Sequence, residues 1–138
     1  MHRVALSLVA FALVAAACGN DSSVEDHLEG PVWELVELIG TELPDDAAPT
    51  LQLSDGTASG VAGCNNFTGG YEREDRDLTF GPLATTRKLC APPLDNVESA
   101  YLAALGDVAS YSIEGNRLIL RSGEGTPVLF YEVPIAAA

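Results

Sequence analysis

Residues Gly60–Tyr71 read GVAGCNNFTGGY and combine four glycines, two adjacent asparagines and one cysteine in twelve positions. Gly60 and Gly63 lie at the expected end of a strand, where a bulge or the close approach of another backbone segment excludes a side chain. Asn65 and Asn66 suit a left-handed turn and can hydrogen-bond to nearby backbone groups. The first half of the stretch therefore predicts a turn that holds a cysteine in a fixed place.

The second half of the stretch is the glycine pair Gly69-Gly70, which we expect to let the chain reverse before Tyr71. Glycine-rich loops can also bind phosphate, but that function needs GxxxxGK[ST] or a GxGxxG that opens a helix. The stretch matches neither pattern. Turn structure is therefore the interpretation that its glycines favour.

A catalytic role for Cys64 would require a base, usually a histidine, beside its sulfur. The only histidines are His2 in the leader and His27 in the polar segment before the body. Neither can be held within about 3 Å of a group in the body, which also excludes a Ser-His-Asp triad. Two cysteines without a nearby histidine make a poor zinc site, and no pair of the many carboxylates stands out. We expect no catalytic residue, metal or cofactor.

The N-terminus predicts the compartment. Val4–Ala17 is uncharged and too short to span a bilayer, which takes about 20 helical residues, but it fits the apolar region of a secretory signal. The three alanines that precede Cys18 resemble the lipobox of bacterial lipoproteins, in which the cysteine is lipidated and becomes the new N-terminus. The alternative is an ordinary cleaved signal in which Cys18 has no role. We expect a lipoprotein signal peptide over residues 1–17 and a lipid-anchored protein on the extracytoplasmic side of the cell membrane.

The net charge limits the kinds of molecule that the protein can bind. The chain carries 20 Asp and Glu against 7 Lys and Arg, a net charge of −13 at pH 7. Such a surface repels nucleic acid and anionic lipid headgroups, so membrane attachment would depend on acyl chains on Cys18. The polar segment GNDSSVEDHLEG follows this cysteine, and we expect residues 18–30 to be an acidic tether and residues 31–138 to form one domain.

Short apolar segments separated by turn residues predict most of the body to be strands. We expect strands in residues 31–38, on both sides of Ser54–Gly56, in 77–83, on both sides of Glu114–Asn116, and in 128–133. One segment, LDNVESAYLAALGD, has apolar residues at helical spacing. There Asp95 is the expected N-cap, Glu98 completes a capping box and Gly106 ends the helix. The pattern predicts an α+β fold: a small curled, mostly antiparallel sheet or partial barrel of about seven to eight strands with one helix packed on it.

The stretch GVAGCNNFTGGY, followed by ATTRKLC, is similar to the paired signature of the META domain family, also called HslJ-like. That signature has an early Trp-x-Leu, a G-x-x-G-C-N segment that runs to G-x-Y, and a Thr-x-x-x-Cys segment. The matching residues are Trp33, Gly60, Gly63, Cys64, Asn65, Gly70, Tyr71, Thr86 and Cys90. The similarity covers about residues 31–133. Lys88-Leu89 replaces a Met-Ala-like pair, and we expect no functional consequence of that difference.

The resemblance implies a small α+β domain of bacterial lipoproteins or secreted proteins, with links to heat shock and to novobiocin resistance. It implies no agreed catalytic residues. It also implies that Cys64 and Cys90 form a disulfide; they are the even pair that remains when Cys18 is lipidated. The alternative is two reduced cysteines buried as small apolar residues.

Two functions remain open at this point. The first is a non-enzymatic, membrane-tethered domain of the cell envelope that binds an unknown envelope protein or supports the envelope under stress. The second is a module that binds a small molecule or lipid in a cavity between the sheet and the helix. Candidate lining residues for that cavity are Trp33, Phe67, Phe80, Tyr101 and Phe130.

Overall fold

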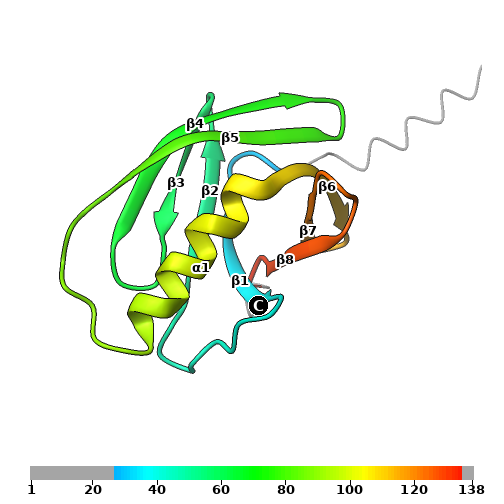
Figure 1. Ribbon diagram of the computed structural model, residues 1–138. Helices are drawn as coiled ribbons and strands as arrows, with labels where there is room; N and C mark the ends of the chain where they lie inside the picture. The colour runs from blue at the N-terminus through cyan, green and yellow to red at the C-terminus, as the bar shows by residue number, and fades with distance from the viewer. Residues whose placement is uncertain (1–26, 135–138) are drawn as a thin grey trace, which may run out of the picture.

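The computed structural model describes residues 27–134, so Cys18, the predicted signal peptide and the last four residues lie outside the described part. The strands are β1 Val32–Leu38, β2 Thr50–Ser54, β3 Thr57–Val61, β4 Asn66–Glu74, β5 Asp77–Thr85, β6 Val108–Glu114, β7 Arg117–Ser122 and β8 Pro127–Glu132; the helix α1 is Leu94–Asp107. Each strand pairs antiparallel with the next, and β1 also pairs with β8, which closes the sheet into a barrel (Figure 1). The predicted fold class is confirmed.

Local turn chemistry explains the expected hairpins. Asp55 and Gly56 join β2 to β3 with φ of 49° and 80°, the left-handed conformations that a two-residue hairpin turn requires. Gly115 joins β6 to β7 with φ of 62°. A two-residue connection brings each strand directly back beside its predecessor, so these hairpins follow from sequence-local preferences.

The glycine pair does not reverse the chain, and that expectation was wrong. Gly69 and Gly70 lie inside β4, where a bulge interrupts the pairing with β5. The reversal comes later, at Asp75, which has φ of 52°. A Cβ placed on Gly69 would lie 2.5 Å from the carbonyl oxygen of Pro82, so close packing of the hairpin requires glycine there.

Gly60 has the role that the sequence predicts. It lies in β3, and a Cβ on it would lie only 2.1 Å from the backbone oxygen of Thr50 in β2. No side chain fits that space without moving the backbone of one strand.

The expected ends of the helix were wrong. Pro93 occupies the N-cap position and makes no side-chain capping bond, so Asp95 lies in the first turn. Proline is tolerated at a helix start because the N–H group that it lacks would have no helical partner there. Gly106 lies inside α1, because the chain passes directly into β6 through an extended Val108 and needs no left-handed residue.

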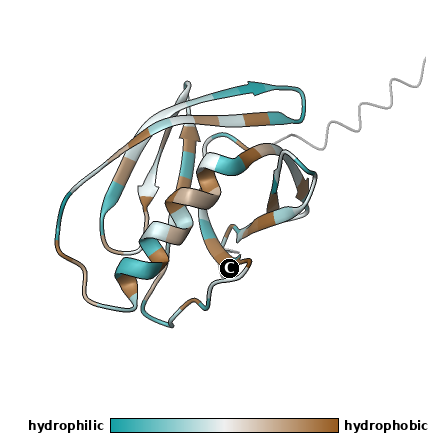
Figure 2. Ribbon diagram, viewed as in Figure 1, coloured by the Kyte–Doolittle hydropathy of each residue, from teal (hydrophilic) through white to brown (hydrophobic). Residues whose placement is uncertain are grey.

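The barrel is weakest between β5 and β6, which share one register pair, Asp77 with Ser110. Figure 1 shows α1 running diagonally across one side of the barrel to the start of β6, and the helix contacts β5 and β7. The helix buries Val97, Tyr101 and Leu105, which lie on one face because they are four residues apart. Figure 2 shows hydrophobic and hydrophilic residues alternating along β5, as expected where a strand has one face toward the core.

Candidate functional site

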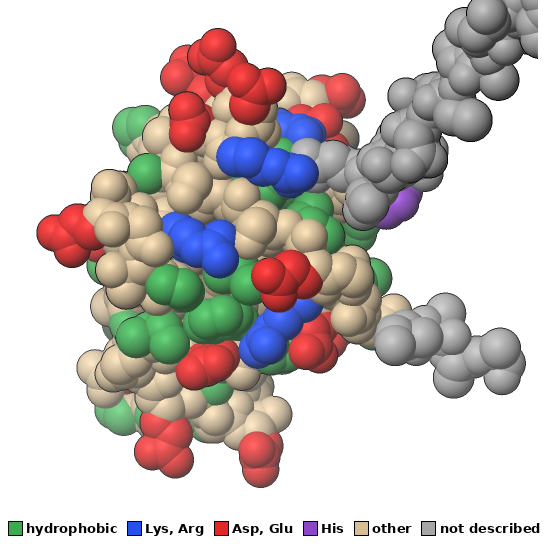
Figure 3. Space-filling view, turned by 90° about the vertical axis from the view of Figure 1, so that its right-hand side faces the viewer, with side chains coloured by type: hydrophobic (Ala, Val, Ile, Leu, Met, Phe, Trp, Pro, Cys, Tyr) green, Lys and Arg blue, Asp and Glu red, His purple; other side chains and the backbone are tan. Residues whose placement is uncertain are grey.

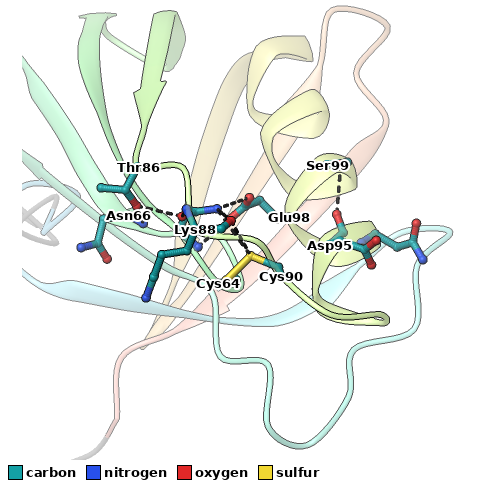
Figure 4. Close-up of a disulfide and its surroundings, with 10 residues drawn as sticks. Cys64, Asn66, Thr86, Lys88, Cys90, Asp95, Glu98 and Ser99 are labelled. Atoms are coloured by element: carbon teal, nitrogen blue, oxygen red, sulfur yellow. Dashed lines mark hydrogen bonds between the residues drawn. A yellow bond between two sulfur atoms is a disulfide. The ribbon is translucent and has the colours of Figure 1, made fainter.

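Four signature residues meet where the loop between β3 and β4 contacts the loop between β5 and α1 (Figure 4). The first loop supplies Cys64 and Asn65, and the second supplies Thr86 and Cys90. The two cysteines are joined by a disulfide across 26 positions of sequence. Lys88 and Glu98 complete the cluster through hydrogen bonds. We call these residues the Asn65 junction: Cys64, Asn65, Thr86, Lys88, Cys90 and Glu98.

Asn65 is at the centre of the junction and is only 4% exposed. Its Oδ1 accepts hydrogen bonds from the backbone N–H of Lys88 at 2.7 Å and the hydroxyl of Thr86 at 3.0 Å. Its Nδ2 donates to the carbonyl oxygen of Lys88 at 3.1 Å and to Oε2 of Glu98 at 2.9 Å. An asparagine amide has two acceptor sites and two donor hydrogens, so every one is in use.

Glu98 connects the helix to the junction. Its Oε1 accepts from the backbone N–H of Asn65 at 2.6 Å, so both carboxylate oxygens bind the same residue. The capping box predicted for Glu98 is therefore wrong, because the carboxylate binds a distant loop instead of its own helix start. Gly63 allows this approach: it has φ of 131°, and a Cβ on it would lie 3.3 Å from the oxygen of Leu94.

Two other signature residues hold the N-terminal end of the domain. Trp33 is buried and donates from Nε1 to the carbonyl oxygen of Leu28 at 3.0 Å. The hydroxyl of Tyr71 donates to the carboxylate of Glu29. Burial and this hydrogen bond raise the pKa of Tyr71 above its ordinary value. Gly70 lies beside Tyr71 in β4.

Leu28 and Gly30, which we expected in the tether, contact the folded domain. Leu28 is fully buried, and the N–H of Gly30 donates to the carbonyl oxygen of Leu53 at 2.9 Å. Gln52 in turn donates to the oxygen of Gly30. The sequence did not predict these contacts because a single leucine in an acidic segment gives no periodic signal.

Two buried tyrosines form a second polar contact in the core. The hydroxyls of Tyr101 and Tyr131 lie 2.9 Å apart, and Tyr101 also donates to the carbonyl oxygen of Thr50 at 3.0 Å. Burial raises the pKa of Tyr101 and of Tyr131 well above the usual tyrosine value. Both hydroxyls stay neutral near pH 7, so neither is suited to act as a base.

The candidate cavity residues do not face one common space. Phe67 packs edge-on against Tyr101 with ring centroids 5.8 Å apart, and Trp33 is buried in the same core. Phe130 lies instead on the outside of the barrel, beneath the guanidinium of Arg117 at 4.8 Å. Phe80 is partly buried at the edge of the core. These contacts count against a ligand cavity between sheet and helix.

Pockets of the described residues lie on the β4–β5 hairpin, and a smaller one of about 330 Å³ lies between the last residue of α1, Asp107, and the turn after β7. On the hairpin, one of about 520 Å³ is lined by residues on both sides of the Asp75 turn, and another of about 450 Å³ lies beside the Gly70 bulge. Neither of these two hairpin pockets is lined by a residue of α1. Within residues 27–134, no group of three or more His, Cys, Asp or Glu side chains could hold a metal ion. No helix in the same range is long and apolar enough to cross a membrane.

The surface carries the acidic excess that the sequence predicts. Figure 3 shows the side of the molecule that lies at the right in Figure 1, where acidic side chains project around the rim and basic side chains lie among hydrophobic ones nearer the middle. Arg121 in β7 donates to the hydroxyl of Ser112 in β6 at 2.7 Å. The arginines of the barrel wall are thus engaged locally, by an aromatic ring or a neighbouring hydroxyl.

Comparison with known proteins gives consistent matches. The family model described as the META domain matches residues 26–134. The heat shock protein HslJ of Escherichia coli (strain K12) is 27% identical over 132 residues, which cover 91% of this chain and 93% of that protein. The NMR structure of a protein from Burkholderia xenovorans superposes with a TM-score of 0.65 and 28% identity, covering 78% of this chain and 85% of that one.

A more distant likeness concerns the fold alone. The crystal structure of a duf4847 family protein from Bacteroides vulgatus has a TM-score of 0.59 at 16% identity, covering 79% of this chain and 96% of that one. The fold is therefore similar in a protein of low sequence identity.

Proposed function

This chain belongs to the META domain family, and from that membership we propose that it is a non-enzymatic, membrane-tethered lipoprotein of the cell envelope. It acts by binding a partner protein, in a process connected with stress. The connection with stress is supported by the name of its relative, the heat shock protein HslJ.

The observation that carries the proposal is the full use of the signature side chains in holding the fold. Every donor and acceptor of the Asn65 amide has a protein partner, and both sulfurs of the junction are bonded to each other. A catalytic group needs a lone pair or a proton that it can give to a substrate. The Asn65 amide has no unused donor or acceptor and the two sulfurs are bonded to each other, which supports a structural role for the signature residues and a binding role for the surface.

Two features support the lipid anchor: the sequence before Cys18 and the short distance along the chain from Cys18 to the folded domain. Cys18 follows an apolar segment and three alanines, as in a lipobox. With Leu28 in the core, nine residues separate Cys18 from the folded domain. Nine residues span at most about 30 Å, so an acyl chain on Cys18 would keep the domain close to the membrane surface.

Mass spectrometry of the N-terminal peptide, purified from membranes, tests this anchor. We expect a peptide that begins at Cys18 and carries the mass of a diacylglyceryl group. Cys18→Ser should abolish that mass, whereas Ser23→Ala, a matched change that leaves the lipobox intact, should retain it. A peptide that begins elsewhere, or that carries no lipid, would refute lipidation while leaving the family and the fold unaffected.

A further inference from the structure

The loop between β5 and α1 has four exposed residues in a row, of which the last three are Arg87, Lys88 and Leu89. We call them the RKL tip. Leu89 is 102% exposed, about twice as much as Val32, Val36 or Ile39, the other exposed large hydrophobic residues of the described chain. Removing such an exposed apolar side chain from water lowers the free energy, so its burial against another molecule would be favourable.

The charged side chains of Arg87 and Lys88 are also able to pair with a partner. No hydrogen bond or ion pair between described residues involves the side chain of Arg87 or Lys88; only the backbone of Lys88 is bonded. Lys88 is the only lysine of a chain with 20 acidic residues. Figure 4 shows its side chain directed away from Glu98 and the disulfide. The tip is thus a local positive charge on an acidic protein.

The Asn65 junction fixes the backbone that carries these side chains. The N–H and the carbonyl of Lys88 both bind the Asn65 amide, and Cys90 is tied to Cys64 directly after Leu89. A loop that is already ordered loses little conformational entropy when it binds. The signature thereby holds the RKL tip in one conformation while leaving its side chains free.

The position of the RKL tip indicates what kind of partner it binds. In Figure 1 the described chain begins at the upper right, whereas the loop that leads into α1 lies at the lower left, at the other end of the molecule. A domain tethered through residues before Leu28 would therefore point the RKL tip away from its own membrane. That orientation favours a protein over a lipid surface.

We propose that the RKL tip is a docking site for a partner protein that presents carboxylates around an apolar pocket. Leu89 enters the pocket, and Arg87 and Lys88 pair with the carboxylates at its rim, an arrangement in which one buried anchor supplies affinity and the charges supply selectivity. This inference rests on the proposed function, because it names the surface through which the tethered protein binds. It replaces the expectation that Lys88-Leu89 has no functional consequence.

Photo-crosslinking in cells that produce the full chain tests the proposal. A benzoylphenylalanine at Ala91, an exposed position beside the tip, leaves all three tip residues in place. A second chain carries the same group at Val36 on β1 as a control surface. We expect an adduct from Ala91 with a protein, identified by mass spectrometry, whose crosslinked surface is acidic.

Variants then test whether the RKL tip is what binds. Arg87→Gln with Lys88→Gln, and separately Leu89→Ser, should each reduce the Ala91 adduct by about tenfold without lowering the unfolding temperature, since all three residues are exposed. Ser54→Glu with Thr57→Glu, on the β2–β3 hairpin, changes the net charge equally and should leave the adduct intact.

The inference would be overturned if the RKL tip bound something other than a partner protein. An adduct that contains only lipid would assign the tip to a membrane, and an adduct between two copies of the chain would assign it to self-association. An adduct from Val36 but none from Ala91 would reject the tip while preserving a binding function. No adduct from either position, or one that the tip variants do not weaken, would also refute it.

Discussion

Asn65→Ala is expected to lower the free energy of unfolding by about 3 kcal/mol, because it removes the centre of the junction. The change leaves the Lys88 N–H and carbonyl without their partners and removes an amide donor from the Glu98 carboxylate. A hydrogen bond to a charged group is worth about 1.5–3 kcal/mol, and each buried group left unsatisfied adds to the loss. Urea denaturation followed by the fluorescence of Trp33, the single tryptophan, measures the effect.

Asn66→Ala is the matched control for that experiment. Asn66 is the next residue and has the same side chain, but it is exposed, and only its backbone takes part in a hydrogen bond with Thr86. We expect a change within about 0.5 kcal/mol, as for most surface substitutions. Equal losses from the two variants would show that burial and bonding of the Asn65 amide do not stabilise the fold.

Replacing both Cys64 and Cys90 with alanine should lower the free energy of unfolding by about 3–4 kcal/mol. The disulfide closes a loop across 26 positions and reduces the conformational entropy of the unfolded chain, so its removal favours unfolding. For a domain of this size the unfolding temperature should fall by roughly 12–16 °C. Differential scanning calorimetry measures this change.

Reduction provides the control for the cysteine variant. The wild-type protein treated with reductant should gain the mass of two hydrogens and should then unfold at the temperature of the double variant. The double variant itself should be insensitive to reductant. If the wild-type mass did not change on reduction, the two cysteines would be free thiols and there would be no Cys64–Cys90 disulfide.

The parts of the fold that could be predicted depend on short-range preferences. Asp55-Gly56 identifies its own hairpin because only a few residues adopt two successive left-handed conformations. Val97, Tyr101 and Leu105 identify the buried face of α1 through helical spacing. The α+β class follows from these elements together, since one helix among short strands has few ways to bury its apolar face.

The parts that could not be predicted depend on distant contacts. Glu98 has the spacing of a capping residue, and no local pattern shows that it binds Asn65, 33 positions earlier. Gly69 resembles a turn residue, although it is required by the approach of Pro82 across the hairpin. The motif includes Cys64, Asn65, Thr86 and Cys90, but it does not include Lys88 or Glu98, because their bonds to Asn65 come from the packing of two loops against a helix.

The interaction energy between Asn65 and Glu98 is the most direct measure of whether the signature residues act as one structural unit. It is obtained from the free energies of unfolding of the wild type, Asn65→Ala, Glu98→Ala and the double variant. Because both carboxylate oxygens bind Asn65, we predict that the double variant loses less than the sum of the single losses by about 1.5–3 kcal/mol. Additive losses, with a coupling below about 0.5 kcal/mol, would contradict a junction centred on Asn65.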